Sequence, residues 1–296
     1  MAILNFGSLC IDNVYRVPHF VRPGETLPST DYQVFAGGKG FNQSLAIARA
    51  GTPVVHAGAY GAGGEWLVDM LRADNVDVAH LHRAGVPTGH AVIQVAEDGG
   101  NAIVLFPGAN RAITREHIDS TLAGFGAGDI LLLQNEISHP GYLIEQGAAR
   151  GLRIVMNPAP MDAVVKALPL HLLHMLVVNE VEAEDLTGKQ YVDEMVQVLG
   201  ERYPDTISVV TLGAGGAVWL SPAECFHVLA HKVDVVDTTG AGDTFTGYLL
   251  ASLEQGMAPE AAMRRATAAA ALCVSRAGAA DSVPRAGEVT VASHAR

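Results

Sequence analysis

The segment with the clearest chemical signature is Asp237-Thr-Thr-Gly-Ala-Gly-Asp243-Thr-Phe-Thr-Gly247. Its inner glycines let the backbone turn with no Cβ in the way, so N–H groups can converge where a helix is predicted to begin, at about Asp243. Such a helix end attracts anions and would suit a phosphoryl group in transfer. A carboxylate beside it can accept the proton of an attacking hydroxyl. Because Asp also caps many helices, Gly-Ala-Gly-Asp alone favours a cap, and only the longer segment favours a catalytic base.

A second glycine-rich segment, Ala36-Gly-Gly-Lys39-Gly-Phe-Asn42-Gln-Ser44, also leads into a predicted helix. Its glycines permit a polar ligand to approach closely, and Lys39 and Asn42 offer hydrogen-bond donors there. An ordinary glycine-rich connection between a strand and a helix is the alternative interpretation. Neither segment is a Walker A loop, because the pattern GxxxxGK[ST] occurs nowhere in the sequence.

Two weaker signals follow apolar runs further along the chain. Asn179 and Glu182 lie three residues apart at the start of a predicted helix and so share one face, and oxygen ligands of this kind suit Mg²⁺. Taken alone, a solvated acidic first turn explains them better. The segment Thr211-Leu-Gly213-Ala-Gly-Gly216 ends a predicted strand in a glycine turn, which fits either a nucleotide-binding turn or a simple hairpin.

The composition excludes several classes of function. The chain has 296 residues, 49% of them hydrophobic and 17% charged, which is enough for a large core and rules out a mainly disordered protein. The net charge is −12 and no basic run interrupts it, so we expect neither a nucleic acid nor an anionic membrane as a partner. Phosphates must then be bound locally, by backbone N–H groups, a metal ion and a few cations.

The cysteines and the N-terminus indicate the compartment. Cys10, Cys225 and Cys273 are scattered, which is typical of a reducing environment and not of a disulfide framework or a thiolate zinc site. The first seven residues are predicted to form a strand and not a signal peptide, and no apolar run approaches the ~20 residues of a membrane span. We therefore expect a soluble, cytoplasmic protein.

Short apolar runs alternate with helical patterns through most of the chain, which predicts an α/β fold: a doubly wound, mostly parallel sheet flanked by helices. The predicted strands are residues 3–6, 54–57, 130–133, 154–157, 175–178 and 207–211, with a further strand-like run at 233–236. The predicted helices are residues 40–50, 64–74, 139–150, 180–187, 192–202 and 259–276, besides the helix that begins near residue 243.

Two stretches break this alternation. Residues 12–34 contain three prolines, and residues 88–106 alternate polar and apolar side chains around a turn at 97–101, as strands exposed on one face do. We interpret both as parts of a small β-sheet lid on a main domain made of residues 1–11, 35–87 and 107–296. An ordinary hairpin on the edge of the main sheet is the alternative.

Together these segments resemble the ribokinase-like (PfkB) family of carbohydrate and nucleoside kinases, and most of all its ribokinase branch. The likeness extends from Gly7 to Pro284 and rests on the two glycine-rich segments, on TLGxxG at residues 211–216, on Met156-Asn-Pro-Ala-Pro160 and on the segment Asn179–Gly188. It implies an ATP-dependent sugar kinase that uses Mg²⁺ and K⁺ and forms a homodimer through the lid. The expected reaction is transfer of the γ-phosphoryl of ATP to a primary hydroxyl of a pentose such as ribose or a close analogue.

The resemblance also implies roles for individual residues. The catalytic base would be Asp243, beside an anion hole formed by Gly240, Ala241 and Gly242. The sugar-binding positions would be Cys10, Asp12, Gly38, Lys39, Asn42 and Glu136. The nucleotide-binding positions would be Asn179, Thr211, Gly213, Gly216 and Thr267. Mg²⁺ would be held through water by Asn179 and Glu182, and the monovalent cation by Asp237, Thr239, Ser275, Gly278 and Ser282.

One departure from the family concerns the sugar. Cys10 stands where the ribokinase branch has an Asn that hydrogen-bonds a sugar hydroxyl, and a thiol is a poor substitute. A buried hydroxyl left without its partner costs about 1–3 kcal/mol. The alternatives are therefore the same chemistry on 2-deoxyribose, a nucleoside or a hexose, and, in another class, a non-catalytic sugar or nucleotide sensor.

Overall fold

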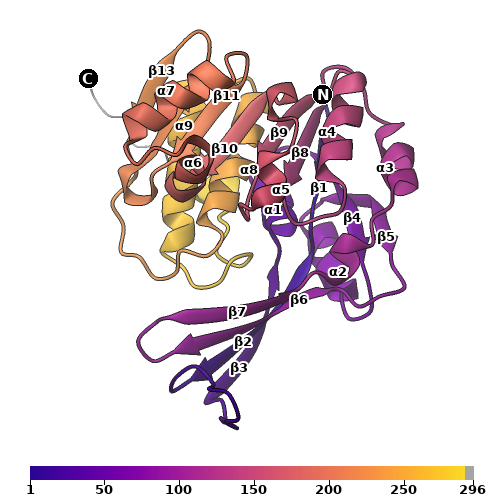
Figure 1. The fold of residues 1–296 in the computed structure, drawn as a ribbon, viewed down its shortest axis with the longest axis vertical. Helices are drawn as coiled ribbons and strands as arrows, with labels where there is room; N and C mark the ends of the chain where they lie inside the picture. The colour runs from indigo at the N-terminus through magenta and orange to yellow at the C-terminus, as the bar shows by residue number, and fades with distance from the viewer. Residues whose placement is uncertain (291–296) are drawn as a thin grey trace.

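The central sheet consists of short strands, most of them continuous apolar runs, because helices cover both of its faces. The computed structural model describes residues 1–290. The strand order is β13-β12-β11-β10-β9-β8-β1-β4-β5, parallel from β5 to β11 and antiparallel at β12 and β13 (Figure 1). Their bounds are β1 Ile3–Phe6, β4 Val54–Tyr60, β5 Asp77–Arg83, β8 Ile130–Gln134, β9 Arg153–Asn157, β10 Met175–Asn179, β11 Ile207–Thr211, β12 Ala217–Leu220 and β13 Cys225–Val228.

Two apolar clusters lie on the two faces of this sheet. Side chains alternate along β1, so Ile3 joins one cluster while Leu4 and Phe6 join the other. The first cluster takes in helices α1 Lys39–Arg49, α2 Glu65–Ala73, α8 Ala241–Glu254 and α9 Pro259–Val274. The second takes in helices α3 Arg115–Leu122, α4 Pro140–Ala149, α6 Glu180–Thr187 and α7 Val192–Arg202. The remaining helical segments are α5 Ala163–Lys166, η1 Gly108–Arg111, η2 Leu170–Leu172, η3 Gly213–Gly215 and η4 Ala286–Glu288.

The second sheet projects from the first as a separate layer (Figure 1). Its order is β3-β2-β6-β7, with bounds β2 Cys10–Val17, β3 Asp31–Gly37, β6 Gly89–Ala96 and β7 Asn101–Phe106. It is not a hairpin added to the edge of the main sheet, so that alternative is wrong. The structure thus confirms the predicted doubly wound fold with a small second sheet, whose strands extend beyond the predicted segments to Cys10 and Gly37. The division into domains at the predicted bounds stays a prediction.

The expected helices and six of the expected strands are present within a few residues of their predicted bounds. The strand predicted at residues 233–236 is wrong. This run follows the last strand of the sheet and finds no strand to pair with; instead the N–H of Val236 bonds the carbonyl of Val274 at the end of α9, at 2.8 Å. Within residues 1–290, no helix combines the length and the apolar character that crossing a bilayer requires.

Candidate active site

The close crossing of α1 and α8 brings the start of one helix to the start of the other. At Gly247, a Cβ would lie 2.5 Å from the Cβ of Ala46, so only a glycine allows this approach. Gly247 lies about one turn after Asp243 on the same face of α8. Asn42 and Gln43, in the first turn of α1, therefore face Asp243 from 200 residues away in the sequence.

The Asp243 carboxylate is held by two amide groups of α1. Asn42 Nδ2 donates to Oδ2 at 3.0 Å, and Gln43 Nε2 donates to Oδ1 at 2.9 Å. The side chain is only 7% exposed. It does not cap its helix, because the N-cap of α8 is Gly240 and receives no side-chain hydrogen bond. The geometry thus rejects the simple interpretation of Asp243 as a cap and leaves a carboxylate positioned beside a cavity.

The first turn of α8 leaves space and donors for an anion. Gly240 has a φ of 78°, which favours glycine, and turns the chain into the helix. A Cβ at Gly242 would meet no atom of the described residues within 4 Å. The N–H groups of Gly242 and Asp243 find no acceptor in the described part of the chain. Both residues line a cavity of about 210 Å³ that has the size and the N–H groups to admit a phosphoryl group.

Four charged side chains converge on this cavity or its border. Burial acts to lower the pKa of Lys39, but the carboxylates of Asp243, Glu136 and Glu182 outweigh it and hold that pKa above its ordinary value. Burial raises the pKa of Glu136, although it accepts hydrogen bonds from Ser8 Oγ and from the Lys39 N–H, the latter at 2.9 Å. Lys39 therefore stays protonated at neutral pH and supplies one positive charge among the carboxylates.

Asn179 and Glu182 form a capping box at the start of α6. The Glu182 N–H donates to Asn179 Oδ1 at 2.8 Å, and the Asn179 N–H donates to Glu182 Oε2 at 3.0 Å. Glu182 is 8% exposed, and burial raises the pKa of its carboxyl. The solvated acidic turn weighed from the sequence is therefore wrong for Glu182, which lines the same cavity as Asp243.

A larger cavity of about 620 Å³ opens next to the first and shares Thr211, Thr238 and Gly242 with it. One wall is apolar and comes from α8 and α9, and Val233 and Val235 of the misassigned run line it as well. The other predicted site residues that line this larger cavity are Gly213, Gly216, Ala241 and Thr267.

Two of those residues also have local structural roles. The Thr267 hydroxyl donates to the Arg264 carbonyl at 2.9 Å within its helix. Gly216 has a φ of 96°, and a Cβ there would lie 2.0 Å from the Val228 carbonyl oxygen. The glycine hairpin weighed from the sequence is thus present, and it borders the larger cavity. That cavity has an apolar wall and adjoins a helix start with unpaired N–H groups among the described residues, a combination that suits a nucleotide.

The residues predicted around a monovalent cation are only partly brought together. Asp237 Oδ1 accepts from the Thr239 N–H and hydroxyl at 2.9 and 2.7 Å, and its Oδ2 accepts from the Gly278 N–H at 3.0 Å. Burial acts to raise the pKa of Asp237, but these hydrogen bonds hold it below its ordinary value. The hydroxyls of Ser275 and Ser282 instead donate to the carbonyls of Leu272 and Ala279.

The predicted sugar-binding positions of β2 lie at the base of the second sheet. Asp12 packs over Gly37, where a Cβ would come within 2.1 Å of Asp12 Oδ2. Burial raises the pKa of Asp12, and the neighbouring Cys10 thiol partly offsets this effect. The Cys10 thiol is itself buried, which raises its pKa, so it stays protonated beside Asp12. Gly38, with a φ of 94°, leads from this strand pair into Lys39.

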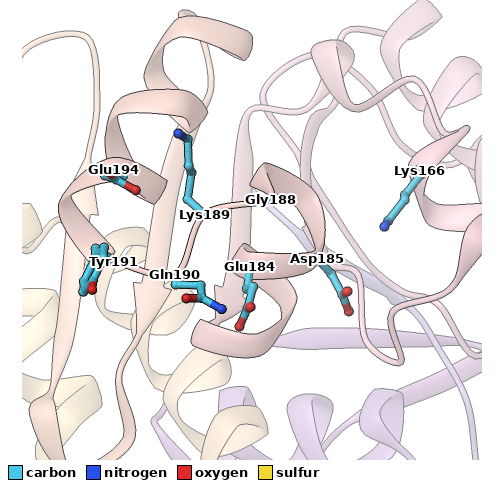
Figure 2. Close-up of a pocket in the computed structure, with 8 residues that line it drawn as sticks. All are labelled: Lys166, Glu184, Asp185, Gly188, Lys189, Gln190, Tyr191 and Glu194. Carbon is cyan, nitrogen blue, oxygen red and sulfur yellow. The ribbon is translucent and has the colours of Figure 1, made fainter.

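A separate hollow on the surface has a different character. Figure 2 shows it between α5, α6 and α7, at the end of α6 opposite to Asn179. Its charged side chains are exposed, and no hydrogen bond or ion pair joins any two of its side chains within residues 1–290. They are Lys166, Glu184, Asp185, Lys189 and Glu194. Nothing there matches the buried, converging polar groups around Asp243.

Comparison with known proteins identifies the family of this chain. The model of the pfkB family of carbohydrate kinases matches residues 2–286. The chain belongs to this family. A ribokinase of Haemophilus influenzae is 34% identical over 94% of each chain. The structure of a ribokinase of Cryptococcus neoformans in complex with ADP superposes with a TM-score of 0.87 at 36% identity, covering 97% of this chain and 98% of that one.

A ribokinase of Arabidopsis thaliana, solved with ribose and ATP, also superposes with a TM-score of 0.87, at 28% identity over 98% of each chain. The protein is therefore an ATP-dependent carbohydrate kinase of the pfkB family.

Several polar residues around the site of this pfkB kinase received no role from the sequence. Gln43 stands inside a motif but was given no function, and Asn5, Gln134 and Asn157 are polar residues in apolar strands. Gln43 Nε2 lies 3.3 Å from Asn157 Oδ1 as well as bonding Asp243. Asn5, Gln134 and Asn157 could have been recognised from the sequence, because each lies near the carboxyl end of a predicted parallel strand. Ligand sites of α/β sheets lie at those strand ends.

Proposed function

We propose that this kinase transfers the γ-phosphoryl of ATP to the primary hydroxyl of ribose or a close pentose analogue, with Asp243 as the general base. The observation that carries the proposal is the placement of one buried carboxylate. It lies at the start of α8 and borders the cavity of about 210 Å³, which shares lining residues with the larger one, and two amides fix it. A base in that position can take the proton of a hydroxyl as the hydroxyl attacks a phosphorus atom.

The donor nucleotide would occupy the larger cavity, with its base against the apolar wall from α8 and α9 and its phosphates directed toward Gly242. Thr211, Gly213, Gly216 and Thr267 border this cavity. The N–H groups of Gly242 and Asp243, which have no acceptor among the described residues, lie next to Gly240 and Ala241. They would stabilise the charge that develops on the phosphoryl oxygens. Lys39 adds a protonated amine to the same region.

The residues around Asn179 fit a magnesium ion held mainly through water and phosphates. The capping box engages Oε2 of Glu182 and leaves Oε1 without a hydrogen bond to any described residue. Residues 1–290 contain no group of three His, Cys, Asp or Glu side chains able to hold a metal, and Mg²⁺ in kinases needs no such cage. When bound, the ion would bridge phosphate oxygens and neutralise their charge.

A monovalent cation such as K⁺ would be held beside the anion hole by the carboxylate of Asp237 and the hydroxyl of Thr239. Ser275, Gly278 and Ser282 belong to the segment that follows α9 and borders this cluster. Because the Asp237 pKa is held low, its carboxylate is ionised at neutral pH, as a cation ligand must be.

The acceptor would lie between Asp243 and the base of the second sheet, among Asp12, Gly38, Lys39, Asn42 and Glu136. The relatives named ribokinase favour ribose. Cys10 keeps 2-deoxyribose as a second candidate, because a buried, protonated thiol offers a sugar hydroxyl only a weak partner.

The second sheet would also form a homodimer interface. Both of its edge strands expose apolar side chains, and on β7 Ile103, Val104 and Leu105 are 56%, 70% and 54% exposed. Unpaired sheet edges that carry apolar residues favour association with another chain. A Val104→Glu variant should sediment as a monomer where the wild type sediments as a dimer, and a wild-type monomer would contradict the interface.

The function is tested by an acceptor panel. The protein is assayed with ATP, Mg²⁺ and K⁺ against ribose, 2-deoxyribose, a nucleoside and a hexose, and both ADP and the phosphorylated product are measured. We expect the highest kcat/KM with the two pentoses, within about tenfold of each other, because one weakened hydrogen bond is worth about 0.5–1.5 kcal/mol. A clear preference for the nucleoside or hexose would overturn the acceptor. No transfer to any acceptor would favour a sensor.

A further inference from the structure

Behind Asp243, a chain of buried amides runs away from both cavities into the centre of the protein. Gln43, which donates to Asp243, accepts through its own Oε1 a hydrogen bond of 2.7 Å from Gln134 Nε2. The same Gln134 nitrogen donates to Asn5 Oδ1 at 3.0 Å. The exposed fractions of Asn5, Gln43 and Gln134 are 0%, 0% and 1%, and none of the three lines a cavity.

The directions of these hydrogen bonds determine how the Gln43 amide faces. Asn5 Nδ2 is already used by the Gly40 carbonyl and by Ser44 Oγ, both at 2.8 Å, so Asn5 turns its oxygen to Gln134. Gln134 must then present its NH₂ group to both neighbours. The Gln43 oxygen accepts from this NH₂ group. The NH₂ group of Gln43 is therefore the part of its amide that can face Asp243. In the flipped orientation, its oxygen would oppose the Asp243 carboxylate and its NH₂ would oppose that of Gln134.

Packing alone does not account for these amides. Gln134 Oε1 has no hydrogen-bond partner among the described residues, and an unpartnered buried carbonyl destabilises a fold. An apolar side chain of similar size would avoid that penalty. What the amide contributes instead is its NH₂ group, which fixes the orientation of Gln43.

We propose that Gln43 is a positioning residue for Asp243, and that Gln134 and Asn5 act through Gln43 by fixing the direction of its amide. The N–H from Gln43 occupies one lone pair of Oδ1 and favours the ionised carboxylate. It also holds the plane of the carboxylate, together with Asn42 on the other oxygen. The remaining lone pairs are then aimed at the acceptor hydroxyl. The inference rests on the proposed role of Asp243 as the base.

The first test replaces Gln43 with Met, which has a similar length and no donor. We expect kcat to fall about tenfold or more, since hydrogen bonds to charged groups are the stronger ones. The Kd for ATP should stay within about twofold, because Gln43 contacts neither cavity. In a plot of kcat against pH, the acid limb is the range in which kcat falls as the pH is lowered. This limb should move to higher pH, since losing an N–H donor disfavours the ionised form of Asp243.

The other groups whose charges bear on Asp243 are left unchanged in these variants. They are Lys39 on α1, Glu136 after β8, Glu182 on α6 and the thiol of Cys273 on α9. A shift of the acid limb can therefore be assigned to the removed amide. Should Gln43→Met fail to fold, Gln43→Glu keeps the size and brings a second carboxyl to Asp243, which should move the acid limb upward even further.

The second test asks whether Gln134 acts through Gln43. Gln134→Met alone should shift the acid limb in the same direction by a smaller amount. In the Gln43→Met background it should add no further shift, because the intermediate amide is already gone. Fully additive shifts would overturn the part of the proposal that concerns Gln134.

Asn110 provides the matched control. It is 4% exposed, and its amide bonds both the N–H and the carbonyl of Leu9, with no link to Asp243. Asn110→Met should lower the melting temperature and leave the acid limb in place. If folded Gln43→Met behaves in the same way, the positioning role is refuted. This result differs from failure of the proposed function, in which Asp243→Asn itself would retain turnover.

Discussion

The two glycine-rich junctions of this kinase differ in what their glycines make possible. Before and within α1, they allow protein to pack on protein: a Cβ at Gly37 would lie 2.1 Å from Asp12 Oδ2, and one at Gly40 would lie 2.3 Å from the Ser8 N. At the start of α8, a Cβ at Gly242 would meet no atom of residues 1–290 within 4 Å. The two similar sequence patterns therefore have different structural roles. The glycines at α1 allow the close packing of the proposed acceptor side of the site, and Gly242 at α8 leaves space for a ligand.

The largest effect on stability should come from Gly40→Ala. The new Cβ would overlap backbone atoms of Gly7 and Ser8, which cannot rotate away. We expect a loss of about 3 kcal/mol or more in the free energy of unfolding, toward the upper end of the range for overpacking. Chemical denaturation measures it. A variant as stable as the wild type would contradict the close packing of β1 against α1.

Gly242→Ala should separate stability from activity. The free energy of unfolding should change by less than about 1 kcal/mol, because the residue lies in a helix and the new Cβ would meet no atom of the described residues within 4 Å. The methyl group would enter the space proposed for the phosphoryl group, so kcat should fall about 10²-fold or more, the loss seen when one oxyanion donor is removed. Thermal unfolding and kcat measured on one preparation test both. Normal turnover would refute the ligand space.

A smaller effect on stability concerns Glu136, whose carboxylate accepts a hydrogen bond from the Lys39 N–H at the start of α1. Burial raises the folded-state pKa of Glu136 above its ordinary value of 4.5. The folded protein then binds more protons than the unfolded chain, so this group's contribution to stability is complete below that value and is lost as pH rises through the raised pKa.

Glu136→Gln removes this titration. The difference in unfolding free energy between variant and wild type should therefore shift in favour of the variant as pH rises from about 4.5 toward neutrality. Denaturation curves at a series of pH values measure the difference. If it stays constant with pH, burial does not set the pKa of Glu136.

The sequence predicted most of the fold because its strands and helices carry local signals. The apolar run Ile3–Phe6 and the capping pair Asn179 and Glu182 are two examples. It failed at residues 233–236, where apolar side chains border the larger cavity and not a sheet. It also gave Gln43 no role, since the hydrogen bond to Asp243 joins residues 200 positions apart and exists only once Gly247 allows α8 to approach α1.

The central claim is that Asp243 is the general base, and the most direct measurement is single-turnover phosphoryl transfer by Asp243→Asn. The Asn side chain keeps the size of the carboxylate and loses the charge that accepts a proton. We expect the Kd for ATP to stay within about threefold, while the rate of transfer to ribose falls about 10²- to 10⁴-fold. A variant that transfers phosphoryl groups within a few-fold of the wild-type rate would contradict the account.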